Sequence, residues 1–433
     1  MSLQGSGTRP QDTGTTAAPE DNGAAQLPAD LQDERLIARQ GISGAVGAFT
    51  SRLRSGDLGS VPVVVGLVII WAVFQIANSS FLSSRNLVNL TLQTTSVGVI
   101  ALGIVLVLLL GEIDLSVGSV SGVAAAVVGV TFVNQGWPIV LSLVAAIALG
   151  VLIGLFYGLL YTRFGVPSFV ITLAGLLGFL GLQLWLLGSR GAVNLPFDSG
   201  LVRFAQLDFV PAWLSYVLAA VAATALFLTG YSLARARRAA GLSGRSTSLL
   251  LARSVAVLLG LGFAVWYLNQ ARGVGWLFVG FVVLVLVLHY VLTRTAWGRS
   301  VFAIGGNVEA ARRAGINVKR MYISVFMLCS SLAALGGLIA AARLAAANQA
   351  SGAGDVNLNA IAAAVIGGTS LFGGRGSAFS ALLGVLVIQS ISSGLTLLDL
   401  DSSFRFMVTG LVLALAVALD SVARRSRAAH GRA

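Results

Sequence analysis

Long runs of hydrophobic residues alternate with short polar stretches along most of the chain. Most of these runs reach the ~20 apolar residues that an α-helix needs to cross the ~30 Å hydrocarbon core of a bilayer. The pattern predicts an all-α polytopic membrane protein of about twelve spans, with ten as the alternative count. The predicted segments are 61–78, 91–110, 116–134, 139–161, 168–188, 212–232, 250–269, 275–292, 321–345, 357–372, 377–398 and 404–422.

Two of these segments differ from the others. The segments at 116–134 and 357–372 are short, rich in Gly and Ala, and flanked by Gly. An interrupted backbone is tolerated at membrane depth only where protein or water covers it. We therefore expect broken or partly buried helices at these two places.

A weak internal repeat relates the two halves of the chain. The string LGVL at 149–152 recurs at 383–386, and Asp114 lines up with Asp355. Segments two to five thus resemble segments nine to twelve, and the two sets enter the membrane from opposite sides. Such inverted repeats are typical of transporter cores, with a pathway between the halves.

The same pattern predicts the division of the chain. Residues 1–54 contain few large apolar groups, so we expect a disordered cytoplasmic tail. A transmembrane domain at 55–423 and a basic cytoplasmic tail at 424–433 follow. Within the domain we expect repeat 1 at 85–190, spacer helices at 211–292, a basic loop at 293–321 and repeat 2 at 321–423.

Basic residues predict the orientation, because positively charged loops stay on the cytoplasmic side. If both termini are cytoplasmic, the opposite side receives six of the 28 basic residues, and the cytoplasmic side receives the other 28 − 6 = 22. Those six are Arg85, Arg190, Arg203, Arg272, Arg343 and Arg405. The net charge of +12 therefore reflects membrane topology, and we expect no nucleic-acid partner.

Composition supports a membrane protein and excludes several kinds of chemistry. Charged residues make up 10% of the chain and the mean hydropathy is +0.89, whereas a soluble domain has about 25% charged residues. One cysteine and two histidines leave no internal disulfide and no metal-ligand cluster. We expect no enzyme, no metal and no cofactor, and the absence of a Walker motif assigns any ATP hydrolysis to a partner.

Polar residues interrupt the apolar sequence at two related places, 111–119 and 352–359. A Ser or Asp at a helix start can cap the free amides, or those amides can face a polar pathway. A capped loop and a pathway lining both remain open at each place. The residues concerned are Glu112, Asp114, Ser116, Ser119, Asp355, Asn357 and Asn359.

The basic loop at 293–321 contains a short helical pattern at 308–314, and Gly315 follows in a position typical of a helix end. A short helix on the cytoplasmic face can act as a handle for a soluble partner. A solvated loop that only obeys the charge rule is the alternative.

Four motifs resemble the sugar permeases of ATP-binding-cassette importers, the ribose, xylose, arabinose and galactose group. They are GEIDLSVGS at 111–119, VPSFVITL at 166–173, GRSVFAIGGNVEAARRAGINV at 298–318 and AIAAAVIGGTSLFGGRG at 360–376. The extra hydrophobic pair within 212–292 resembles the xylose-type branch.

The resemblance implies a ten-helix core with inverted halves, like the vitamin B12-importer type, plus an extra helix pair. It implies a homodimeric permease in a bacterial cell membrane, a cytoplasmic ATP-binding subunit and an extracytoplasmic sugar-binding protein. The expected cargo is a monosaccharide, D-xylose or a related pentose, moved through the lipid bilayer by alternating access.

The resemblance also implies that 305–317 is the coupling helix that docks on the ATPase. The residues expected to carry this contact are Gly306, Asn307, Glu309, Ala310, Ala311, Arg312, Gly315 and Asn317.

Three other functions are compared with this one. A permease of the same superfamily could carry nucleosides or branched-chain amino acids. An ion-coupled secondary transporter would need carboxylates inside the membrane, whereas most acids here lie at predicted span ends. A membrane enzyme would need a catalytic set that the sequence does not contain.

Overall fold

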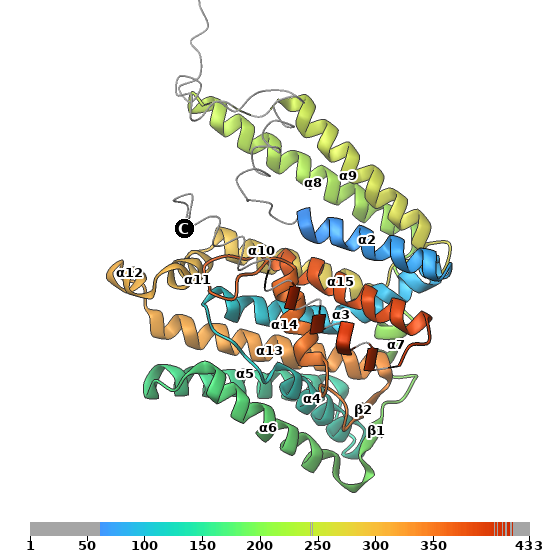
Figure 1. Cartoon of the computed structure of the whole chain (residues 1–433), viewed down its shortest axis with the longest axis vertical. Coiled ribbons are helices and arrows are strands. Elements are labelled where there is room, and N and C mark those ends of the chain that lie inside the picture. The colour runs from blue at the N-terminus through green and yellow to red at the C-terminus, as the bar shows by residue number, and fades with distance from the viewer. Residues whose placement is uncertain are drawn as a thin grey trace, which may run out of the picture.

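A computed structural model describes residues 61–401 except Ser243 and Arg245, together with scattered positions between 403 and 418. The predicted tails at 1–54 and 424–433 lie outside the described residues, as does most of the predicted segment at 404–422. The other eleven predicted segments all form helices (Figure 1), which confirms the all-α polytopic fold.

Nine helices of the described residues are long and apolar enough to cross a membrane. They are α3 (Ser84–Leu109), α4 (Val117–Val128) with its π-helical extension η2 (Gly129–Asn134), α5 (Ile139–Phe164), α6 (Ser168–Leu187), α8 (Ala212–Ala239), α9 (Thr247–Leu268), α10 (Trp276–Arg294), α13 (Val318–Leu344) and α15 (Ala378–Leu397). Two shorter apolar helices, α2 (Val61–Ala77) and α14 (Val356–Ile366), complete the set.

Several short elements lie between the long helices. α11 (Ala296–Gly306) and α12 (Val308–Arg313) lie at one end of the bundle, here called the α12 end (left in Figure 1). The opposite end, called the strand end, carries α7 (Gly200–Gln206), the turn η3 (Gly188–Arg190) and two strands. β1 (Ala192–Asn194) pairs antiparallel with β2 (Ala346–Asn348) and joins the segments after α6 and α13.

The two parts of the chain that were predicted as repeats pack against each other. α13 packs against α3, α4 and α5, and α3 in turn packs against α13, α14 and α15. A Cβ added at Gly103 would lie 2.9 Å from the carbonyl oxygen of Cys329, and one at Gly336 would lie 2.9 Å from that of Ser96. The sequence separations are equal, since 336 − 103 = 233 and 329 − 96 = 233. These reciprocal contacts are those expected of two related halves that face each other.

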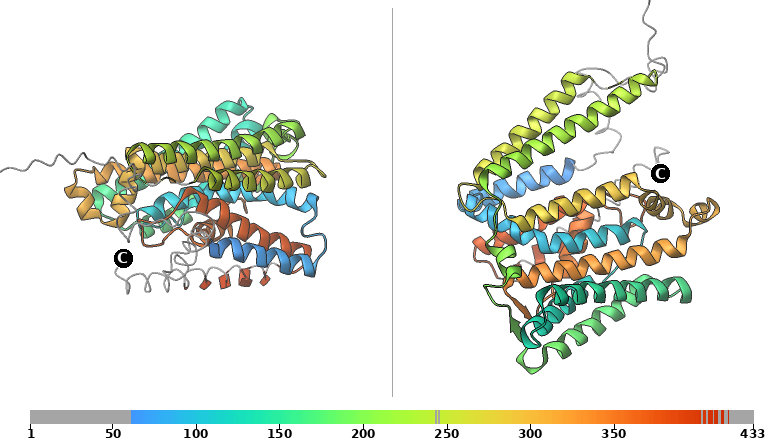
Figure 2. Two further views of the ribbon diagram at one scale, coloured as in Figure 1. Left: turned by 90° about the horizontal axis from the view of Figure 1, so that it is seen from above. Right: turned by 180° about the vertical axis from the view of Figure 1, so that it is seen from behind.

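The α8–α9 hairpin lies outside this pair of halves. Its two helices pack on each other and lean away from the bundle, as the views from the front and from behind both show (Figures 1 and 2). The hairpin is fastened at the strand end, where Tyr267 donates a hydrogen bond of 2.9 Å to the carbonyl of Leu82 and Arg272 donates one of 2.8 Å to Asn89. The sequence predicts these two helices as part of a spacer at 211–292, and that division stays a prediction.

The reciprocal glycine contacts can be tested by adding a methyl group at each position. We expect Gly103→Ala and Gly336→Ala each to destabilise the protein by about 1–3 kcal/mol, because the added Cβ meets the backbone of the facing helix. Thermal unfolding in detergent, followed by size-exclusion chromatography, measures the effect.

Gly260→Ala on α9 is the matched control. A Cβ there meets nothing within 4 Å, so the greater helix propensity of Ala should leave stability equal or improved. If all three variants unfold at the same temperature, the close α3–α13 contact is wrong.

Candidate functional site

The N-terminal ends of α4 and α14 meet in the interior of the bundle. The side-chain amide of Asn357 donates a hydrogen bond of 2.7 Å to the carbonyl of Leu115, just before α4 begins. Gly118 and Gly352 approach so closely that a Cβ on either would collide with the carbonyl oxygen of the other. We call this place the central junction.

From the central junction the two helices run in opposite directions. α4 and its extension reach the strand end, where Gly129 lies against Val193 of β1 and Ala347 of β2. α14 runs toward the α12 end, and the loop after it is fixed there by a 2.9 Å hydrogen bond from the Gly374 amide to the carbonyl of Leu109. Neither segment is a regular α-helical span, because α14 is a short apolar helix and α4 reaches span length only together with the π-helical η2.

Asp114 is fully buried beside the central junction. One oxygen of its carboxylate accepts hydrogen bonds from the Ser116 amide (2.8 Å) and the Ser116 hydroxyl (2.7 Å), and the other lies 3.7 Å from the Cys329 sulfur. Ser116 occupies the N-cap position of α4, but its side chain makes no cap hydrogen bond. The expected cap is thus replaced by a turn that Asp114 holds, because the hydroxyl is already used as a donor to the carboxylate.

The remaining residues predicted around the two breaks make hydrogen bonds within the bundle. Ser119 is buried and donates a 2.8 Å hydrogen bond to the Leu176 carbonyl of α6. Buried Asn359 donates one of 2.9 Å to Asp355, which is exposed. Ser119 thus joins α4 to α6, whereas Asn359 and Asp355 pair within the first turn of α14.

Gln183 is a buried polar residue that was not among the predicted site residues. Its amide donates to the carbonyls of Asn348 (2.9 Å) and Ser351 (2.8 Å), so it ties α6 to the end of β2 and to the loop that follows. In the sequence this role shows only as one glutamine in an apolar run, and many membrane helices carry such a residue for packing.

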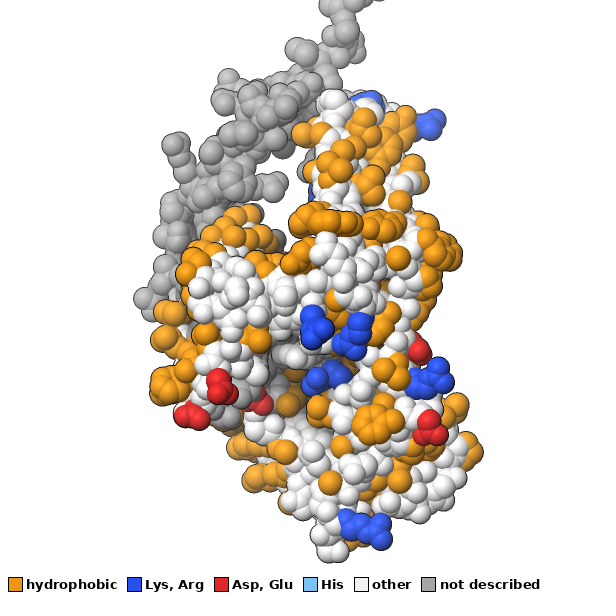
Figure 3. Space-filling model, turned by 90° about the vertical axis from the view of Figure 1, so that its right-hand side faces the viewer, with side chains coloured by type: hydrophobic (Ala, Val, Ile, Leu, Met, Phe, Trp, Pro, Cys, Tyr) orange, Lys and Arg blue, Asp and Glu red, His pale blue; other side chains and the backbone are white. Residues whose placement is uncertain are grey.

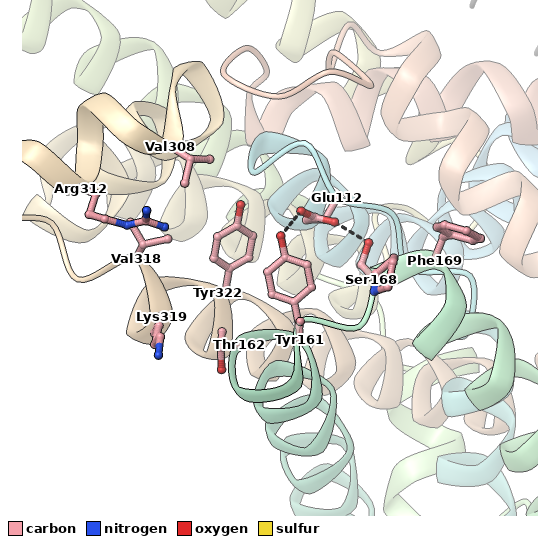
Figure 4. A pocket seen from close by; sticks show the side chains of 12 residues that line it. Glu112, Tyr161, Thr162, Ser168, Phe169, Val308, Arg312, Val318, Lys319 and Tyr322 are labelled. Atoms are coloured by element: carbon pink, nitrogen blue, oxygen red, sulfur yellow. Dashed lines mark hydrogen bonds between the residues drawn. The ribbon is translucent and has the colours of Figure 1, made fainter.

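Glu112 lies apart from the central junction, although it is only two residues from Asp114. Its two carboxylate oxygens accept hydrogen bonds from the hydroxyls of Tyr161 (2.6 Å) and Ser168 (2.5 Å). Figure 4 shows the three side chains converging from the loop after α3 and from the two helices α5 and α6. Glu112 therefore fastens the α3–α4 connection to the α5–α6 turn.

A cavity of about 490 Å³ separates Glu112 from α12 and the start of α13. The ring of Tyr161 lies 4.6 Å from that of Tyr322, centre to centre, and this pair stands between the carboxylate and the basic side chains (Figure 4). The lining residues are Glu112, Tyr161, Thr162, Gly165, Pro167, Ser168, Phe169, Val308, Arg312, Val318, Lys319 and Tyr322.

The predicted short helix is present as α12. Asn307 accepts a 2.9 Å hydrogen bond from the Ala310 amide at its start, and Gly315 after its end has φ +82°, which favours glycine. Glu309 and Arg312 form an ion pair of 2.6 Å on its surface. Asn317 caps the next helix by accepting a 3.1 Å hydrogen bond from the Arg320 amide.

The predicted residues of this loop divide into an outer and an inner set. Ala311 is buried and packs toward the helix bundle, whereas its neighbour Ala310 is exposed. The exposed members are Gly306, Asn307, Glu309, Ala310, Arg312, Gly315 and Asn317.

Comparison with known proteins identifies the family. The family described as "Branched-chain amino acid transport system / permease component" matches residues 86–417. The xylose transport system permease protein XylH of Escherichia coli K12 is 36% identical over 381 residues, covering 88% of this chain and 95% of that protein. This chain belongs to the sugar-permease family of ABC importers.

Other relatives extend the same conclusion. The xylose permease of Haemophilus influenzae is 34% identical over 86% of this chain and 98% of that protein. The ribose import permease RbsC of Escherichia coli K12 is 31% identical over 83% of this chain and 92% of that protein. No solved structure matches.

Family membership makes this chain a multi-pass monosaccharide permease. An ABC importer implies two further components, an ATPase and a binding protein. The described residues contain no group of three His, Cys, Asp or Glu side chains that could hold a metal ion.

The buried turn at Asp114 makes a prediction about stability. Asp114→Leu leaves the amide and the hydroxyl of Ser116 without an acceptor, and each such buried group costs about 1–3 kcal/mol. Asp114→Asn keeps one carbonyl oxygen as acceptor and should lose much less. Thermal unfolding of the detergent-purified protein compares the two, and equal stability of both variants with the unchanged protein would contradict the assigned turn.

Proposed function

We propose that this chain is the permease subunit of an importer for D-xylose or a related pentose, with transport driven by a separate ATPase through alternating access. The observation that carries the proposal is 34–36% identity to xylose permeases over 95–98% of their length. The ribose permease of Escherichia coli and the fructose permease of Rhizobium meliloti are each 31% identical to this chain. The matches cover smaller shares of those proteins, 92% and 86%.

We propose that both termini face the cytoplasm of a bacterial cell and that the α12 end is the cytoplasmic end. The charge distribution supports this orientation, because loops at the α12 end are strongly basic. Arg294, Arg299, Arg313, Lys319 and Arg320 lie there. At the strand end, acidic and basic side chains occur together (Figure 3).

The proposed contact with the ATPase is α12 and its two flanking asparagines. The helix protrudes at the α12 end, and most residues expected to carry the contact are exposed. Ala310 leaves room for close approach, while Glu309 and Arg312 present opposite charges that can set the direction of docking. Buried Ala311 would serve differently, by joining α12 to the bundle.

A second copy of the permease is proposed to pack on α6. This helix exposes Gly178 and Gly181, and a Cβ at either would meet nothing within 4 Å. Small residues on a lipid-facing helix allow another helix to approach closely. Leu177 and Leu184, which are also exposed, flank this narrow face.

The central junction is the proposed part of the sugar pathway within each subunit. Two helix N-termini meet there, and their free amides are polar groups inside an otherwise apolar bundle. Small relative movements of α4 and α14 would expose or cover these groups, as alternating access requires. ATP binding can drive the change only if the ATPase contacts one permease state better than the other.

Reconstitution tests the function directly. The permease, its ATPase and its binding protein, placed together in liposomes, should take up radiolabelled xylose only when ATP is present. Ribose, fructose, a nucleoside and leucine form the comparison panel. Uptake of xylose without the ATPase would reject the importer proposal, and preferred uptake of leucine or a nucleoside would reject the sugar assignment.

Gly315→Pro tests the role of α12. Proline fixes φ near −65°, whereas Gly315 has φ +82°, so the end of α12 must rearrange. We expect ATP-driven uptake to fall by about tenfold or more while the protein stays in the membrane, since even a small displacement of a positioned group has effects of this order.

Gly241→Pro is the matched control, because Gly241 has φ +71° in the turn after α8, away from α12. Uptake and ATP hydrolysis should remain close to those of the unchanged protein. Equal loss of uptake in both variants would argue that Gly315→Pro acts through misfolding and not through coupling.

A further inference from the structure

Glu112 faces two cations across the cavity beside α12. Its carboxylate is half-buried and accepts hydrogen bonds from two neutral hydroxyls. Within the described residues, it forms no ion pair. Arg312 and Lys319 line the opposite wall of the same 490 Å³ cavity. Opposite charges thus lie on two walls of one cavity, with the Tyr161–Tyr322 pair between them.

Arg312 is the better placed of the two cations. In Figure 4 its guanidinium points toward Tyr322 and Glu112, whereas Lys319 points away. Its present partner is Glu309 on the same short helix, and both side chains are largely exposed, at 60% and 64%. Exposed ion pairs contribute little to stability, so this pair can be exchanged easily.

We propose that Arg312 and Glu112 form an electrostatic latch between the coupling helix and the membrane domain. In the conformation described here the latch is open, and Arg312 is held by Glu309. When α12 moves toward the α5–α6 turn, the Tyr322 ring between them must turn aside, the cavity closes and Arg312 transfers to Glu112. This inference rests on the proposed role of α12 in contacting the ATPase.

The closed pair would be stronger than the open one for two physical reasons. Glu112 is less exposed than Glu309, and lower exposure to water strengthens the attraction between opposite charges. An Arg guanidinium can also bind both oxygens of one carboxylate, and Tyr161 and Ser168 now supply only one hydrogen bond to each oxygen.

Because of its position in the chain, Glu112 connects the latch to the starts of α4 and α14. Glu112 is two residues from Asp114, which holds the turn that starts α4 at the central junction. Three residues before Glu112, at the end of α3, the carbonyl of Leu109 accepts a hydrogen bond from the amide of Gly374 in the loop after α14. Movement of the Glu112 segment would therefore reach both interrupted helices. Glu112 is a positioning residue in this account and does not contact the sugar.

The test uses the complete transporter in proteoliposomes, with uptake of xylose and ATP hydrolysis measured in parallel. Arg312→Glu places two like charges across the cavity, and Glu112→Gln removes the acceptor charge. Each should lower sugar taken up per ATP by about tenfold, the order expected for a lost charge-assisted hydrogen bond. Arg299→Glu, the same change on an exposed arginine of α11 outside both the cavity lining and α12, should retain uptake within about twofold.

The exchanged double variant Glu112→Arg with Arg312→Glu separates the latch from ATPase docking. Restored coupling in this variant supports the latch, because a docking defect at the surface of α12 cannot be repaired by a change at Glu112. Coupling as low as in Arg312→Glu alone overturns it.

A second readout does not depend on transport. Glu112→Cys with Arg312→Cys, in a Cys329→Ala background, should form a disulfide on treatment with copper phenanthroline in only one of the ATP-bound and ATP-free states. Mass spectrometry of the linked peptides detects it, and Glu112→Cys with Arg313→Cys is the control pair. Equal cross-linking in both states, or equal cross-linking by the control pair, overturns the latch.

Failure of the latch and failure of the proposed function are distinguishable. If the unchanged transporter shows no ATP-dependent uptake of any sugar, the proposed function fails. If it transports normally and Glu112→Gln behaves like Arg299→Glu, only the latch is wrong.

Discussion

Every backbone polar group inside a bilayer needs a partner within the protein, and this constraint is most demanding where a helix is interrupted. The helices α4 and α14 are the two interrupted ones, and their starts lie against each other at the central junction. Asn357 supplies a donor to the free carbonyl of Leu115, and Gly118 and Gly352 allow the two backbones to touch. Each interruption thus covers the other. The two long helices α3 and α13 pack around this pair and remove it from lipid.

The same arrangement connects the interior of the bundle with its α12 end. The segment after α3 carries both Glu112, which is held by the α5–α6 turn, and Asp114, which holds the start of α4. The loop after α14 is tied to the end of α3 through Gly374. A partner that moves α12 would therefore act on a short, well-connected piece of chain, and not on each membrane helix separately. The α8–α9 hairpin, fastened mainly at the strand end, stands outside this connection.

Hydrophobic patterning predicted all of the long helices, because twenty apolar residues in a bilayer have few alternatives to a helix. Gly and Ala content also predicted which two segments are interrupted, and Gly315 predicted the end of α12. The pairing of β1 with β2 and the short helix α7 were not predicted, since three to seven residues carry too weak a pattern and depend on tertiary contacts. The separate surroundings of Glu112 and Asp114 were missed for a similar reason. The two residues are only two positions apart, but their side chains reach different helices. Only the folded structure shows which helices each side chain contacts.

The central claim is that the interrupted helices and the segment joining them to α12 are the part that responds to the ATPase. Hydrogen–deuterium exchange of the assembled transporter in lipid nanodiscs, with and without ATP, measures this response most directly. The account predicts a change in amide exchange at residues 110–120 and 349–357 between the two states, with no change in the α8 helix at 212–239. The same exchange at 110–120 in both states, in a preparation that transports sugar, would contradict it.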